Sequence, residues 1–234
     1  MKTLIRRLKR LILQTPRKSS HSAPLTHDKH PEAYWVQRKQ NDIGQMSVDE
    51  ILTSNQADTY NALVKTLLTE TPKTIVDLGC NISAVGQLLL SSGYTGQYTG
   101  VDFNLYGLRQ AATYFDRLGF NKRFVRANVR QLPFKDATFT FVVMKDVIEH
   151  MEDFRPFVAE AARVAKDGII ISTFILWTEG ETIIRREPPG YYHNMYNRFE
   201  VVEFCKTLGF SVSKVISCMD MQARPNEIVL FKKQ

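Results

Sequence analysis

Two aspartates stand at the ends of neighbouring apolar segments in the middle of the chain. Asp77 lies at the end of Thr74–Leu78, and Asp102 ends Gln97–Asp102, 25 residues further on. A carboxylate in the position of Asp102 can accept hydrogen bonds from both hydroxyls of a ribose, or it can cap the following helix. A buried Asp77 needs partners, which could be turn N–H groups or a cationic ligand group. The pair predicts a nucleoside-shaped hollow between the two segments.

The turn after Thr74–Leu78 is expected to bring the backbone close to a ligand. Gly79 permits that approach, and the helix expected over about 84–91 offers free N–H groups at its N-terminus. Asn81 and Ser83 stand where a dinucleotide-binding turn would carry further glycines. Because Asn tolerates left-handed geometry better than most residues, Asn81 can preserve the turn.

Further candidate residues follow the later strands. Phe103 could stack beside an adenine or belong to the core, and Asn128 could bond an adenine edge or serve in a turn. Asp146, Glu149 and His150 come directly after the fourth expected strand, near the predicted cleft. His150 could act as a general base on a hydroxyl, or it could be a structural histidine.

His193 is the second candidate base. It lies in GYYHNMYNRF (190–199), which could form a lid over a bound molecule or a well-packed loop. The preceding stretch, 175–189, is a long insert without clear regular structure, and loops of that length are often functional.

Alternating strands and helices must bring these residues together. Such an alternation predicts a mostly parallel sheet with helices on both faces. The last two strands follow each other closely, which predicts an antiparallel hairpin at one edge of the sheet. The helix over about 154–164 is expected to end at Asp167–Gly168. Strands are expected at 74–78, 97–102, 123–127, 139–144, 169–173, 210–216 and 227–232, with helices at about 57–68, 84–91, 105–118, 154–164 and 199–208.

Composition and charge limit the class of protein. The chain has 234 residues and is 44% hydrophobic, enough for one domain with appendages and a sizeable core. Its three cysteines show neither zinc spacing nor a disulfide framework, so a reducing, cytoplasmic compartment is expected, with no metal site. Residues 1–20 hold seven of the 31 Lys and Arg residues and none of the 24 Asp and Glu residues. The remaining chain is therefore formally neutral, which argues against a nucleic-acid partner.

Three regions are expected along the chain: a basic tail (1–20), a linker with a helical lead (21–72) and a folded domain (73–234). Residues 1–14 place apolar side chains on one helical stripe among basic residues, a pattern that can lie peripherally on an anionic membrane. The same pattern is also typical of a leader packed on the body, or of a cleaved targeting peptide. The helical lead could cover the cleft or pack on the sheet edge.

An ordered series of segments resembles the class I S-adenosylmethionine-dependent methyltransferases. The series covers about residues 70–234 and consists of VDLGCNIS (76–83), GVDFN (100–104), ANVRQLPF (127–134), FVVMKDVIEHM (141–151), ARVAKDGIIIST (162–173) and LGF (208–210). The resemblance implies a doubly wound α/β fold, with a seven-stranded, mostly parallel Rossmann-like sheet whose last strand is antiparallel. It also implies that S-adenosylmethionine lies across the carboxyl ends of strands one, two and four.

The same resemblance assigns roles by position. Asp77, Gly79 and Cys80 would surround the methionine part of the cofactor, within the turn that Asn81 completes. Asp102 would hold the ribose, with Phe103, Asn128 and Val129 around the adenine. Lys145 and Asp146 would face the methionine end and the substrate.

The function expected on this basis is methyl transfer to an oxygen or nitrogen of a small-molecule or lipid-linked acceptor. His150, His193 and Asp146 are the candidate catalytic residues. Methyl transfer needs mainly placement of the acceptor in line with the activated methyl group. The alternative is a catalytically inactive, methyltransferase-like module that binds or assembles near a membrane, which the missing glycines favour.

Overall fold

The computed structural model describes residues 50, 53, 56–116, 120, 122–174, 177–188, 190–219 and 225–234. The basic tail (1–20), including the predicted amphipathic stretch 1–14, lies outside the described residues, as does most of the predicted linker. The boundaries of the three expected regions therefore stay predictions. Among the described residues, no helix is both long enough and apolar enough to cross a membrane.

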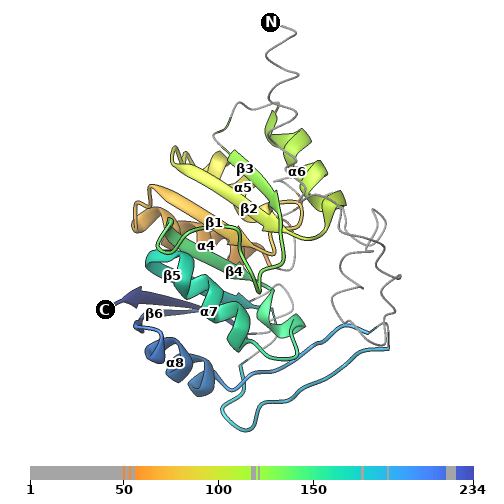
Figure 1. The fold of residues 1–234 in the computed structure, drawn as a ribbon, viewed down its shortest axis with the longest axis vertical. Coiled ribbons are helices and arrows are strands. Elements are labelled where there is room, and N and C mark those ends of the chain that lie inside the picture. The colour runs from red at the N-terminus through yellow and green to blue at the C-terminus, as the bar shows by residue number, and fades with distance from the viewer. Residues whose placement is uncertain are drawn as a thin grey trace, which may run out of the picture.

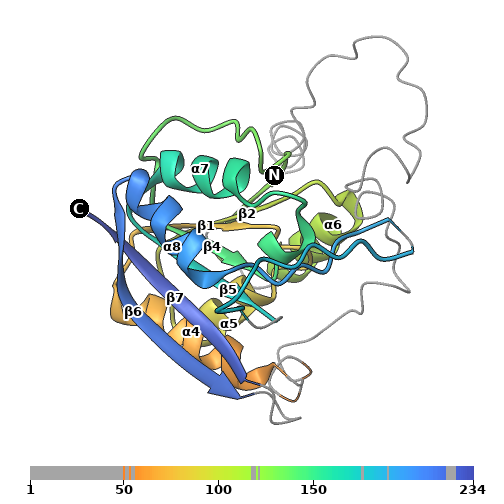
Figure 2. The same cartoon turned by 90° about the horizontal axis from the view of Figure 1, so that it is seen from below.

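Seven strands form one sheet in the order β3-β2-β1-β4-β5-β7-β6. Figure 1 labels the strands from β1 to β6, and Figure 2 labels β7 beside β6. The first five strands run parallel, and β7 is antiparallel to both of its neighbours. This confirms the predicted fold class, including the closing hairpin. The strands are β1 (Thr74–Leu78), β2 (Gln97–Asp102), β3 (Lys122–Arg126), β4 (Phe139–Lys145), β5 (Ala165–Thr173), β6 (Phe210–Met219) and β7 (Pro225–Lys233).

Helices cover both faces of the sheet, and Figure 2 shows α7 on one side with α4 and α5 on the other. Alternate residues of the central strands feed the two layers of core: Val142 packs with the α7 side, and Val143 packs with the α4 side. The helices are α4 (Ala57–Thr69), α5 (Ala84–Ser91), α6 (Leu105–Asp116), α7 (Arg155–Val164) and α8 (Arg198–Thr207), with a short 3₁₀ turn, η1, at Ile148–His150.

One predicted boundary is wrong. The α7 helix ends at Val164, and Asp167–Gly168 lies inside β5 instead of ending the helix. A Cβ atom on Gly168 would come within 2.5 Å of the Phe141 ring and 2.8 Å of the Phe231 carbonyl oxygen. The glycine therefore permits close packing in the sheet and does not act as a helix stop.

A two-stranded arm, residues 177–188 and 190–197, connects β5 to α8. Isolated bridges pair Thr178 with Asn197, Ile183 with Met195 and Arg186 with Tyr192. Figures 1 and 2 show the arm extending away from the sheet. The long insert seen in the sequence is thus a folded-back pair of extended segments, and its return segment carries His193.

Candidate active site

A cavity of about 560 Å³ lies at the carboxyl ends of β1, β2 and β4. That volume falls within the usual range of roughly 300–1,000 Å³ for small-molecule sites. Both aspartates line the cavity, so the hollow predicted between the first two strands exists. Of the residues proposed from the sequence, those lining it are Asp77, Gly79, Cys80, Asn81, Asp102, Phe103, Val129, Lys145, Asp146, His150 and His193.

Asp102 is held by the backbone of two turns. One carboxylate oxygen accepts the Asn81 N–H at 2.9 Å, and the other accepts the Asn104 N–H at 2.7 Å. Burial raises the pKa of Asp102 above its usual value. Each oxygen keeps acceptor capacity, so a diol can still bind to this fixed carboxylate.

The β1–α5 turn contains three residues in left-handed geometry. Gly79 has φ +74°, and a Cβ there would come within 2.6 Å of a Val147 methyl group. Asn81 (φ +48°) and Ser83 (φ +65°) adopt positive φ without being glycines. Such geometry costs about 1–2 kcal/mol at a non-glycine residue, which the surrounding contacts must offset.

A buried hydrogen-bond chain gives Ser83 a structural role. The Ser83 hydroxyl donates to the Tyr98 hydroxyl at 2.8 Å, and Tyr98 donates to Asp77 Oδ2 at 2.6 Å. All three side chains are buried. Because glycine would remove the first link, the departure from the expected glycine pattern builds a support for Asp77.

The Asp77 carboxyl group is poorly hydrated and faces the cavity. Burial raises its pKa to about 7, while the Tyr98 hydrogen bond and the charge of Lys145 lower it and the charge of Asp102 raises it. An ammonium group bound nearby would favour the ionised form. Asp77 at the end of β1 suits an ammonium group, and Asp102 at the end of β2 suits the two hydroxyls of a ribose. Together they fit a ligand that joins an amino acid to a nucleoside.

Lys145 ends β4 and is almost entirely buried. Its ammonium group donates to Asp146 at 2.5 Å and to the side-chain oxygen of Gln56, and it lies 4.3 Å from the centre of the Tyr60 ring. Burial lowers the pKa of Lys145, but the charge and hydrogen bond of Asp146 together with the charges of Tyr60 and Glu149 hold the pKa above its usual value. Since Gln56 and Tyr60 line the cavity, the segment before β1 covers the cleft.

Four rings that pack together form part of the cavity lining, and we call them the aromatic wall: His150, Phe174, Tyr191 and His193. All four line the cavity. Ring centres lie 4.8 Å apart for Tyr191 and His193, 5.2 Å for the two histidines and 5.5 Å for His150 and Phe174. The wall joins η1, the end of β5 and the arm.

Backbone contacts set the tautomer of His150. Its Nδ1 lies 2.8 Å from the Tyr192 carbonyl oxygen, which can only accept a hydrogen bond. Nδ1 therefore carries the proton, and Nε2 is the basic nitrogen of the neutral ring. His193 has its pKa lowered by burial and by Arg185, although Glu187 acts in the opposite direction.

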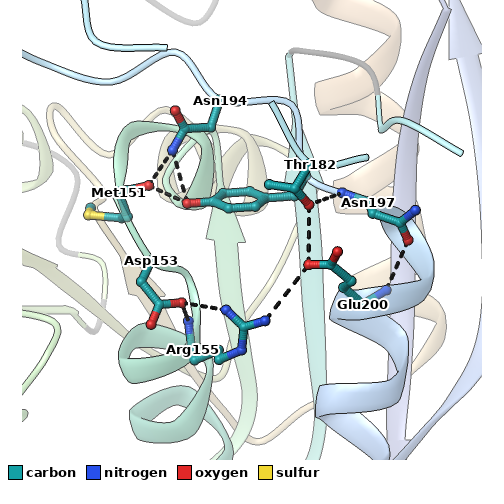
Figure 3. Close-up of polar contacts among 8 residues, drawn as sticks. Met151, Asp153, Arg155, Thr182, Asn194, Asn197 and Glu200 are labelled. Atoms are coloured by element: carbon teal, nitrogen blue, oxygen red, sulfur yellow. Dashed lines mark hydrogen bonds and ion pairs between the residues drawn. The ribbon is translucent and has the colours of Figure 1, made fainter. Parts of the chain in front are cut away.

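Buried polar contacts fix the arm against the body, as Figure 3 shows. The Asn194 side-chain NH₂ donates to the Met151 carbonyl oxygen at 2.5 Å and to the Tyr196 hydroxyl at 3.0 Å. The Asn194 backbone N–H donates to the Glu149 carbonyl oxygen at 2.8 Å. In the outer part of the network, Thr182 donates to Glu200, which lies 3.7 Å from the Arg155 guanidinium group.

Glu149 connects the same segments through its buried side chain and its backbone. Its carboxyl group accepts the Phe174 N–H at 3.1 Å, and only 1% of the residue is exposed. Burial raises the pKa of Glu149 well above its usual value, and the charge of Asp146 raises it further. Glu149 thus holds η1, β5 and the arm in a fixed arrangement.

Asn128 is the one proposed site residue that does not line the cavity. It is exposed, and its side-chain oxygen accepts the Arg130 N–H at 2.9 Å, the turn role left open in the sequence. Sequence reasoning missed Gln56, Tyr60, Tyr98, Phe174 and Asn194. No local pattern marks them, because each acts through residues distant in the chain. Among the described residues, no group of three or more His, Cys, Asp or Glu side chains could hold a metal.

Comparisons with known proteins agree with this geometry. Residues 76–172 match the family model described as a methyltransferase domain. Over 107 residues, the chain is 33% identical to a probable chloroplastic tocopherol O-methyltransferase of Oryza sativa subsp. japonica, covering 44% of this chain and 29% of that protein. It is 26% identical over 107 residues to a phthiotriol/phenolphthiotriol dimycocerosates methyltransferase of Mycobacterium ulcerans, covering 46% and 37%. The matched part thus spans well under half of these curated relatives.

Solved structures share the fold. The chain superposes on the 1,6-didemethyltoxoflavin-N1-methyltransferase of Burkholderia thailandensis with a TM-score of 0.63 and 17% identity, covering 75% of this chain and 77% of that one. It superposes equally well (0.63, 16% identity) on the magnesium protoporphyrin IX methyltransferase of Synechocystis PCC 6803, covering 92% and 100%. The ordered motifs, the sheet order and these matches lead to one conclusion: residues 76–172 match a methyltransferase domain, and the chain has the Rossmann-like fold of S-adenosylmethionine-dependent methyltransferases.

Proposed function

We propose that this protein transfers a methyl group from S-adenosylmethionine to an oxygen or nitrogen atom of a small-molecule acceptor, free or lipid-linked. The observation that carries the proposal is one cavity whose lining contains two sets of residues, one suited to the cofactor and one suited to the acceptor. Asp77 and Asp102 line one part, and His150 and His193 line another. A relative named as a tocopherol O-methyltransferase supports a free small-molecule acceptor. A relative named as a methyltransferase of dimycocerosates supports a lipid-linked acceptor.

The cofactor half of the cavity fits S-adenosylmethionine by its chemistry. Asp102 would accept hydrogen bonds from the ribose hydroxyls, and Asp77 would face the ammonium group of the methionine part. Glycine at position 79 leaves room for the Val147 side chain, which a Cβ would meet at 2.6 Å, so the turn keeps its left-handed geometry at the cavity. When bound, the cofactor supplies a methyl group on a positively charged sulfur, and that carbon–sulfur bond breaks as its electron pair goes to sulfur.

The acceptor half would hold the incoming atom and take its proton. As the acceptor oxygen or nitrogen forms the new bond to carbon, its proton passes to Nε2 of His150. The Tyr192 carbonyl keeps that ring in the required tautomer. Placing the acceptor and excluding competing water would supply most of the rate enhancement.

Calorimetry with S-adenosylhomocysteine, the demethylated product, tests the cofactor assignment. The wild type should release heat on binding, and Asp102→Ala should bind at least tenfold more weakly, because hydrogen bonds to a charged group contribute about 1.5–3 kcal/mol each. Asp116→Ala, which removes an exposed carboxylate at the end of α6, is the matched control and should bind like wild type. No heat from wild type at millimolar ligand would refute the assignment.

Mass spectrometry of metabolites and lipids, from cells with and without the gene, tests turnover. A feature that loses one methyl in the deletion identifies the acceptor. Cofactor binding without any such feature would favour the inactive module instead.

A further inference from the structure

The aromatic wall is a shaped surface rather than a chance grouping of rings. Its members come from three separate parts of the chain: η1, the end of β5 and the arm. Their centres are spaced at 4.8 to 6.4 Å. Those are the separations at which rings attract through edge-to-face or offset contacts. The rings therefore pack against one another as one cluster, and all four also line the cavity.

Buried hydrogen bonds fix the wall in place. Asn194, 1% exposed, bonds to the Glu149 and Met151 carbonyl oxygens, which flank His150. The Asn194 side-chain oxygen also accepts the Arg185 N–H, which secures the outgoing segment of the arm. Because these bonds are buried and mutually supporting, the rings are preorganised and need little ordering when a ligand binds.

The charge of the cavity argues against an anionic group on this side. Among the described lining residues, Lys145 is the one lysine or arginine. Its ammonium group is already engaged by Asp146, Gln56 and the face of Tyr60. Burial keeps the pKa of His193 below its usual value. The aromatic wall thus offers no cation to pair with an anion, and the Asp146 carboxylate, which also lines the cavity, would repel one.

Resting on the proposed function, we propose that the acceptor is a planar aromatic or conjugated ring bearing an un-ionised hydroxyl, and that it stacks against the aromatic wall. The ring hydroxyl is the methylated group: as the carbon–oxygen bond forms, the methyl–sulfur bond of S-adenosylmethionine breaks with its electron pair going to sulfur, and the hydroxyl proton passes to His150. A saturated ring of the same size lacks the π-face. A ring carrying a carboxylate would leave a buried charge without a cation.

Three matched probes test this on protein saturated with S-adenosylhomocysteine. They are 2-naphthol (flat and neutral), decahydro-2-naphthol (saturated, same hydroxyl) and 2-naphthoate (flat and anionic). Calorimetry should give 2-naphthol an affinity at least tenfold above each of the other two. A smaller preference over the saturated alcohol, or tighter binding of the carboxylate, would overturn the inference.

Variants assign the preference to the aromatic wall. Tyr191→Leu removes one π-face while keeping bulk, and it should lower 2-naphthol affinity at least fivefold with S-adenosylhomocysteine affinity unchanged. Phe199→Leu is the matched control, since Phe199 is 56% exposed and does not line the cavity. Should Tyr191→Leu fail to fold, Phe174→Leu makes the same test. An unchanged 2-naphthol affinity in the folded variant would contradict the inference.

The two levels of the proposal fail differently. If wild type does not bind S-adenosylhomocysteine, the proposed function fails and takes this inference with it. If it binds the cofactor product but shows no preference among the probes, only the ring acceptor is refuted.

Discussion

The contacts that hold the two halves of the cavity differ in how far apart their residues lie in the sequence. The cofactor half rests on two consecutive strand–turn–helix units, and the groups holding Asp102 lie within 21 residues of it. The acceptor half joins segments far apart in sequence. Asn194 bonds to Met151 across 43 positions, and His150 bonds to Tyr192 across 42.

This difference separates a half that is held by backbone and turn geometry from a half that is built by side-chain packing. Backbone N–H groups and turn geometry hold the cofactor side, and these need few specific side chains. The acceptor side is a product of side-chain packing between η1, β5 and the arm. We therefore expect the two sides to respond independently to substitution.

The largest expected effect comes from His150→Gln, which removes the base and keeps a polar side chain. Methyl transfer to the acceptor identified by mass spectrometry should fall roughly 100- to 10,000-fold. S-adenosylhomocysteine affinity, measured by calorimetry, should stay within about twofold of wild type if the halves are independent.

His193→Gln is the comparison for that prediction. It should cost less, because His193 Nδ1 lies 3.7 Å from the Glu187 carboxylate, beyond hydrogen-bond distance, whereas His150 Nδ1 is held by a backbone carbonyl group. A larger loss in His193→Gln than in His150→Gln would assign the base to His193.

Asn194→Ala should loosen the acceptor half alone. It leaves the Arg185 N–H without its bond and removes two donors to buried oxygens, so we expect unfolding free energy to drop by about 1–3 kcal/mol. Binding of 2-naphthol should weaken several-fold, with cofactor-product affinity unchanged. Asn61→Ala, on the exposed face of α4, is the control. An equal loss of cofactor-product affinity would show that the two halves are coupled.

The pH dependence of binding sharpens the cofactor half. An ammonium ligand prefers the ionised form of Asp77, whose pKa burial raises to about 7. Affinity for S-adenosylhomocysteine should therefore fall as pH decreases below 7, by roughly tenfold per unit.

Tyr98→Phe should move that midpoint to higher pH. In the wild type, the hydrogen bond from Tyr98 lowers the pKa of Asp77, so its removal should raise that pKa. Tyr94→Phe, whose hydroxyl donates to the Gln97 carbonyl oxygen instead, should leave the midpoint unchanged. Affinity that does not vary between pH 5.5 and 7.5 would mean that Asp77 does not contact the ammonium group.

Ser83→Gly should have the smallest effect. Glycine relieves left-handed strain of about 1–2 kcal/mol but loses the hydrogen bond to Tyr98, a contribution of about 1 kcal/mol. Denaturant unfolding should shift by about 1 kcal/mol or less, with cofactor-product affinity within twofold. A tenfold change in affinity would mean that Ser83 contacts the ligand or controls Asp77 more strongly than the hydrogen-bond chain implies.

The sequence predicted the parts of the molecule that depend on local patterns. The strands Thr74–Leu78 and Gln97–Asp102 have the predicted bounds, and the helix expected over about 199–208 is observed as α8. Gly168 was misread because its role is set by Phe141 on a neighbouring strand. Local reasoning cannot find such a contact.

The candidate site follows the same division. Asp77 and Asp102 were found because they end strands, and the histidines were found only as alternatives. Tyr98 reads as an ordinary strand tyrosine, and nothing local distinguishes it from Tyr94. Asn194 reads as one polar residue in a loop, whereas in the fold it is the buried centre of a network.

Gln56 and Tyr60 show that the binding site extends beyond the part of the chain that matches the methyltransferase domain. The family match begins at residue 76, yet a wall of the cavity comes from the segment before β1. A protein shortened to start at residue 73 would expose Lys145 and strip the α4 cover from the sheet. Truncation at the homology boundary would thus remove part of the binding site along with a layer of the core.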